Sequence, residues 1–110
     1  MSLYLCVFHD DKEIGAVDAG AYSDFGDFRN AVHAIEGGPW GHRFPILMNQ
    51  PDADGRWEVQ HLDALGAELT TLASETSLNR FIDSEGRSLS AALLALCNGA
   101  LAIGRPIIFQ

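Results

Sequence analysis

The sequence predicts an α+β fold in one domain, with the element order β-β-α-β-α-(β)-α-β and one mixed sheet that helices cover on at least one face. Short apolar runs typical of strands lie near both ends of the chain, and three longer segments between them repeat apolar residues at helical spacing. The length of 110 residues suits one domain. Because no linker, repeat or low-complexity segment divides the chain, we expect residues 1–110 to form a single unit.

Two strands are expected at the start of the chain. Residues 3–9 form an apolar run with β-branched and aromatic members, and residues 13–21 form a weaker one. The polar link Asp10-Asp11-Lys12 between them indicates a hairpin.

The first helix is expected to start near Ser23, which can act as its N-cap, with Asp24 and Asp27 in the first turn, where the helix dipole favours negative charge. Gly37-Gly38-Pro39 ends this helix. Its apolar face follows a spacing of three and four residues: Phe25, Phe28, Val32 and Ile35.

The middle of the chain is expected to contain a third strand at residues 44–48, with Pro45 near its start, where a missing N–H is tolerated. Residues 49–55 are dense in turn formers and predict a loop. An amphipathic helix is expected from Trp57 onward, with an apolar face made of Val59, Leu62, Leu65, Leu69 and Leu72.

The last third of the chain begins with a polar region, residues 74–87, that contains a short candidate strand at Phe81-Ile82. Ser88 can cap a final helix, which Gly104 closes, and Pro106-Ile107-Ile108-Phe109 predicts a final strand. The core is expected to contain Leu5, Val7, Phe28, Leu47, Leu65, Leu69, Leu93, Leu96 and Ile108.

The charge is strongly acidic, with a formal net charge of -8. This balance argues against nucleic acid or an anionic membrane as the direct partner, because both require Lys and Arg to neutralise phosphate. No run reaches the roughly 18 apolar residues that a membrane span needs. Residues 9–27 carry six acidic residues and one base, Lys12. They form either a solvated surface or a patch that attracts a basic partner.

The compartment expected from the sequence is the cytoplasm. The apolar start of the chain lacks the basic leader and small-residue cleavage site of a secretory signal. Cys6 and Cys97 both lie in apolar surroundings, where cysteine usually behaves as a small buried hydrophobe. We therefore expect two free thiols.

One segment resembles a cation-binding loop. Residues 50–57 lead into a helix as an EF-hand loop does, with Asp52, Asp54 and Gly55 at positions 3, 5 and 6. Gln50 and His61 then stand where calcium needs an anionic oxygen and a bidentate Glu. The alternative is a structural turn that caps the following helix.

Other catalytic and cofactor signals are weak. The four histidines, at positions 9, 33, 42 and 61, show no zinc-site spacing, and strand alternation separates Cys6 from His9. No serine-hydrolase elbow or phosphate-binding glycine motif is present. We expect no catalytic residue, cofactor or metal. Trp40 and Trp57 are each either a lid on the core or an anchor at an interface.

Several segments of the chain form a recognisable series: Leu3-Tyr4-Leu5-Cys6-Val7-Phe8, residues 22–29, residues 43–47, residues 52–57, Phe81-Ile82-Asp83 with Gly86, and residues 104–110. In this order they resemble immunity protein family 70, and the resemblance covers nearly the whole chain. It implies a bacterial protein of a polymorphic toxin system that binds and neutralises the toxin encoded beside it, without enzyme activity.

Two functional hypotheses follow. In the first, the protein is a non-catalytic immunity protein whose partner is a cognate, basic toxin protein, with neither nucleic acid nor membrane involved and the oligomeric state left open. The residues expected to contact the toxin are Asp10, Asp11, Glu13, Asp52, Asp54 and Trp57. In the second, it is a small ligand- or metal-binding domain or an enzyme that uses Asp52 and Asp54 with a histidine.

Overall fold

Four strands form one antiparallel sheet in the computed structural model, which describes residues 2–50 and 55–110. The strands are β1 (Ser2–His9), β2 (Lys12–Ala21), β3 (Arg56–Trp57) and β4 (Ile107–Phe109), and their order across the sheet is β2-β1-β4-β3. All three strand pairings are antiparallel, so the expectation of a mixed sheet is wrong. β1 and β2 are antiparallel because a tight turn joins them as a hairpin, and β4 runs antiparallel to both of its neighbours, β1 and β3.

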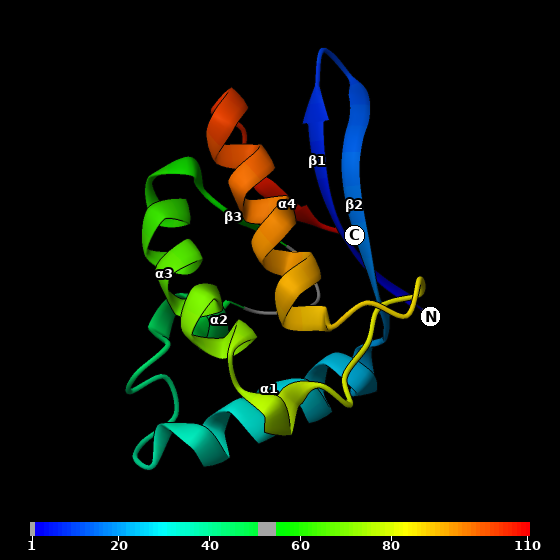
Figure 1. Cartoon of the computed structure of the whole chain (residues 1–110). Helices are drawn as coiled ribbons and strands as arrows, with labels where there is room; N and C mark the ends of the chain where they lie inside the picture. The colour runs from blue at the N-terminus through cyan, green and yellow to red at the C-terminus, as the bar shows by residue number, and fades with distance from the viewer. Residues whose placement is uncertain (1, 51–54) are drawn as a thin grey trace.

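Four α-helices accompany the sheet in the described residues: α1 (Tyr22–Glu36), α2 (Pro45–Asn49), α3 (Leu62–Ala73) and α4 (Leu89–Ile103). Two short 3-10 turns, η1 (Val59–His61) and η2 (Thr76–Leu78), lie on either side of α3. The helix α4 packs against β2 and β4, α3 packs against α4, and α1 lies at the end of the molecule away from the hairpin turn (Figure 1). The α+β fold class is therefore confirmed.

The core lies between the helices and one face of the sheet. Eight of the nine predicted core residues are buried, and only Ile108 is half-buried. Ile108 pairs with Cys6, whereas Phe109 pairs with the core residue Leu5. Because successive side chains alternate across a strand, Phe109 and Ile107 point into the core and Ile108 points to the other face.

The third strand expected at residues 44–48 is wrong, because this segment forms the helix α2. Pro45 occupies its first turn, where a proline is tolerated because its missing N–H has no helical partner. The carboxylate of Glu68 accepts hydrogen bonds from the backbone N–H groups of Ile46 and Leu47. Tertiary contact with α3 thus stabilises a helix of five residues, which is too short to be stable by itself.

The other helices match the expected segments with shifted starts. The N-cap of α1 is Ala21 rather than Ser23, and the Asp24 side chain accepts the hydrogen bond from the Ala21 N–H. The helix expected from Trp57 begins at Leu62, because residues 56–57 pair with β4 as β3. Ser88 is the N-cap of α4, as expected. The candidate strand at Phe81-Ile82 is a single bridge between Ile82 and Ser88.

Candidate functional site

The turn between β1 and β2 carries the acidic residues that the sequence singled out. Asp10 and Asp11 form this turn with positive φ angles of 52° and 64°. Two consecutive left-handed residues are the signature of a type I′ hairpin turn, which favours Asn and Gly. Glu13 follows on β2, and all three side chains are exposed. We call Asp10, Asp11 and Glu13 the acidic tip; it lies where the hairpin projects from the body (Figure 1).

A β-bulge lies next to the acidic tip. Val7 pairs with Gly15 and Phe8 pairs with Glu13, so Ile14 has no partner residue on β1. The side chain of Ile14 is 53% exposed at this bulge. Ile14 thereby becomes part of an open surface between the hairpin and α4.

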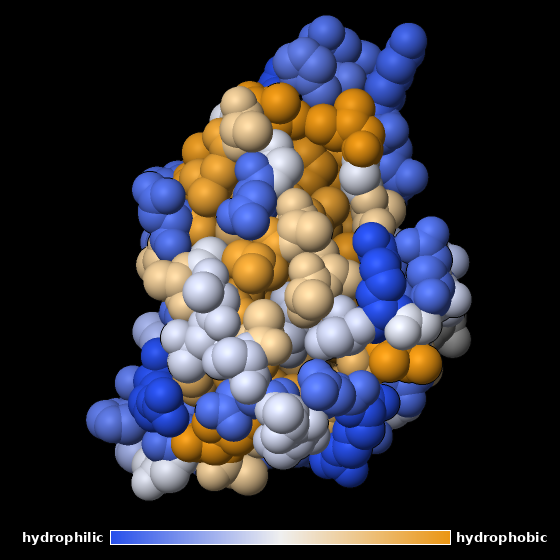
Figure 2. Space-filling model, viewed as in Figure 1, coloured by the Kyte–Doolittle hydropathy of each residue, from blue (hydrophilic) through white to orange (hydrophobic). Residues whose placement is uncertain are grey.

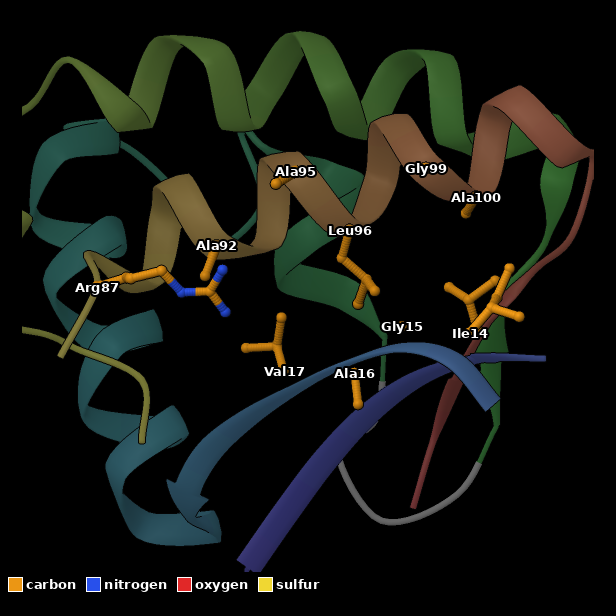
Figure 3. Close-up of a pocket in the computed structure, with 11 residues that line it drawn as sticks. Ile14, Gly15, Ala16, Val17, Arg87, Ala92, Ala95, Leu96, Gly99 and Ala100 are labelled. Carbon is orange, nitrogen blue, oxygen red and sulfur yellow. The ribbon is translucent and has the colours of Figure 1, made fainter. Parts of the chain in front are cut away.

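An apolar groove runs between β2 and α4, with a volume of about 240 Å³ (Figure 3). Seen from outside, an apolar surface lies over α4 below the hydrophilic end of the hairpin (Figure 2). The walls consist mainly of glycine, alanine and aliphatic residues: Val7, Ile14, Gly15, Ala16, Val17, Ala92, Ala95, Leu96, Gly99 and Ala100, with Arg87 as the charged member. We call this the β2–α4 groove.

Arg87 is held at its place beside the groove by acidic partners. Its guanidinium lies 2.8 Å from an Asp83 carboxylate oxygen and 3.0 Å from one of Glu85. Asp83 also accepts hydrogen bonds from the backbone N–H groups of Glu85 and Arg87. Two carboxylates, those of Asp83 and Glu85, therefore face the single positive charge of Arg87.

Trp57 does not lie on the surface, so its assignment as an interface anchor is wrong. It is 2% exposed, its ring lies edge-on to Phe109 at 4.7 Å, and its Nε1 donates a hydrogen bond to the carbonyl oxygen of Ile46. Trp57 thus joins β3 to α2 inside the fold. Trp40 is 43% exposed, and its Nε1 donates to the carbonyl oxygen of Met48. Asp52 and Asp54 lie outside the described residues.

The buried carboxylates serve the fold. Glu36 accepts hydrogen bonds from the N–H groups of Gly41, Arg43 and Phe44, and so holds the loop after α1. Burial alone would raise the pKa of Glu36, but these three donors lower it below its usual range. Burial raises the pKa of Glu68 although two N–H groups act in the opposite direction.

The two thiols are poor nucleophiles. Both are buried, and burial raises the pKa of Cys6 and that of Cys97 to about 11, with Glu13 adding to the effect at Cys6 and Asp63 at Cys97. His9 is exposed at the end of β1, whereas Cys6 is 1% exposed. Within the described residues, no three side chains of His, Cys, Asp or Glu gather as metal ligands. Among the helices that the structure describes, none is long and apolar enough to cross a membrane.

Comparison with known proteins assigns the family. The family model described as Immunity protein 70 matches residues 3–78. This chain belongs to the immunity protein 70 family. A search of curated proteins and a search of solved structures each found no match. The matched residues run from β1 to η2, so they include the acidic tip and the β2 wall of the groove, whereas α4 follows the matched region.

Proposed function

We propose that this member of the immunity protein 70 family binds a cognate toxin protein in the cytoplasm and neutralises it without catalysis. Family membership carries this proposal. The buried reactive groups support it, because both thiols are shielded from solvent, and Glu36 and Glu68 are engaged by backbone N–H groups.

The toxin that suits this protein is basic. The net charge of -8 attracts a cationic partner over distance, and the acidic tip presents three carboxylates on a projecting turn. Charges at the rim of an interface act mainly on the association rate. We therefore assign the acidic tip the role of guiding the toxin to the surface, and Trp57 the role of maintaining the fold.

Co-expression tests the proposal. The toxin domain encoded by the adjacent gene is expressed in a bacterial host alone and together with this protein, and growth is followed. Restored growth, together with a complex of the two purified proteins on size exclusion, is the expected result. Growth arrest that this protein does not relieve, with no complex formed by a catalytically inactivated toxin, would show that the function is another one.

A further inference from the structure

We propose that the β2–α4 groove receives an apolar side chain from a basic segment of the toxin, while the acidic tip contacts the cationic residues next to that side chain. This inference rests on the proposed function and adds to it the place and the chemistry of the contact.

The size of the groove suits protein side chains. Its volume of about 240 Å³ lies below the roughly 300–1,000 Å³ of clefts that hold drug-sized ligands. Its lining is apolar apart from Arg87, and Ile14 is 53% exposed at its wall. A small apolar hollow beside charged residues is typical of the pockets that take an anchor residue of a partner protein.

Gly99 lines the groove on the α4 side and is exposed. It lies inside α4, where glycine destabilises a helix relative to alanine. A Cβ atom added at Gly99 would meet no atom within 4 Å. Gly15 differs, because a Cβ there would lie 3.1 Å from Cδ1 of Leu96, so packing already accounts for that glycine. The groove is therefore open above Gly99, so a side chain of a partner can approach the α4 backbone there.

The charge around the groove selects a basic occupant. The acidic tip contributes three acidic side chains, and the ion pairs of Arg87 with Asp83 and Glu85 contribute two more. The basic residues beside them are Arg87 itself, Lys12, which pairs with His9, and Arg105, which contacts His9. Arg87 is bound by Asp83 and Glu85, and the Arg105 Nε lies 3.4 Å from Nδ1 of His9. An apolar side chain flanked by Lys or Arg matches both the lining and the rim.

The first test introduces a bulky side chain at the mouth of the groove. Ala95→Trp places a large ring at an exposed position that lines the groove, and Ala34→Trp places the same ring at an exposed position of α1. Binding to the catalytically inactivated toxin domain of the adjacent gene is measured by titration calorimetry, with circular dichroism as a check of the fold. We expect Ala95→Trp to raise the Kd about tenfold or more, and Ala34→Trp to leave it within about twofold.

Thiol protection gives a second test that does not depend on disturbing the interface. Because both native thiols are buried, the exposed Ala95→Cys and Ala34→Cys variants each offer one reactive thiol. Bound toxin should slow alkylation of the Ala95→Cys variant at least about tenfold and leave the Ala34→Cys variant unchanged. Protection of the Ala34→Cys variant alone would place the toxin on α1 and overturn the proposal.

The outcomes separate this inference from the proposed function. If the wild-type protein binds no toxin, the proposed function itself is wrong. If the wild type binds the toxin, but Ala95→Trp binds equally well and the thiol of Ala95→Cys stays equally reactive in the complex, only the assignment of the groove is wrong. A free wild type that is a dimer on light scattering, and that Ala95→Trp makes monomeric, would assign the groove to a second copy of this chain.

Discussion

The carboxylate of Glu68 in α3 accepts a hydrogen bond of 2.9 Å from the backbone N–H of Leu47 in α2. A second bond of 3.1 Å comes from the N–H of Ile46. The carbonyl of Ile46 in turn accepts the hydrogen bond from Trp57 Nε1. One side chain of α3 therefore stabilises α2, and α2 helps to hold β3 in place.

Glu68→Gln should destabilise the fold by about 1–3 kcal/mol, because glutamine has one acceptor oxygen and its NH2 group faces the other N–H donor. Urea denaturation followed by circular dichroism measures the change. Glu85→Gln is the control, since Glu85 is exposed and loses only a surface ion pair worth at most about 1 kcal/mol. Equal midpoints for the two variants would contradict the role assigned to Glu68.

Glu36 should make stability depend on pH in the acidic range. Its pKa is lowered in the folded protein, so the stability that its ionised form contributes is present above the ordinary glutamate pKa and is lost as pH falls through the lowered value. The difference in unfolding free energy between wild type and Glu36→Gln should therefore be largest near neutral pH and shrink below pH of about 4. A difference that stays constant from neutral pH to pH of about 3 would contradict this assignment.

Shortening side chains of α4 should cost more stability on the side of the helix that faces the core than on the side that lines the groove. Leu93 is 0% exposed, whereas Leu96 is 9% exposed and lines the β2–α4 groove. Leu93→Ala and Leu96→Ala should each cost about 2–5 kcal/mol, with Leu96→Ala nearer the lower limit because solvent can enter the space it leaves. Guanidinium denaturation measures both. An unchanged midpoint for Leu96→Ala would show that its burial contributes nothing.

The native thiols should resist modification. With a pKa of about 11, roughly one thiol in a thousand is ionised at pH 8, and burial also blocks access. Ellman's reagent should therefore detect no fast-reacting thiol in the native protein and two in guanidinium. One rapid equivalent in the native state would mean that Cys6 or Cys97 is accessible.

Local patterns predicted the long elements and failed where distant contacts decide the structure. Apolar periodicity identified α1, α3 and α4, although α3 begins at Leu62 rather than at Trp57, and of the expected N-caps only Ser88 of α4 is confirmed. The run Phe44-Pro45-Ile46-Leu47-Met48 suits a strand or a short helix, and Glu68, more than twenty residues away, selects the helix. The position of Ile108 depended on the register between β1 and β4, which a sequence pattern does not contain.

The candidate site was predictable only where local sequence determines it. Two adjacent acids in a polar link predicted an exposed acidic turn, and Asp10 and Asp11 lie there. Trp57 was ambiguous, because a tryptophan after a turn suits both a surface and a core position, and its bond to Ile46 is tertiary. The groove was missed because it depends on how α4 packs against β2, which is a tertiary contact that a local sequence pattern does not contain. The signal that could have indicated it is Gly99 inside an Ala- and Leu-rich helix.

The acidic tip allows stability and binding to be changed in opposite directions. Asp10 and Asp11 both adopt positive φ angles, which Asn and Gly tolerate better, and their like charges repel each other. The double variant Asp10→Asn with Asp11→Gly should therefore stabilise the fold by about 0.5–1 kcal/mol. The same variant removes two of the three charges that we assign to toxin association.

Its association rate with the toxin should therefore fall, and the remaining rate should depend less on salt, because screening acts on the charges that were removed. The dissociation rate should change little, since apolar contacts in the groove stay intact. Stopped-flow mixing at low and high salt measures both rates, and thermal denaturation measures stability. Asp27→Asn, at an exposed position of α1, is the charge control. A more stable variant that associates as fast as the wild type would leave the acidic tip without a part in binding, whereas a less stable one would refute the strain argument alone.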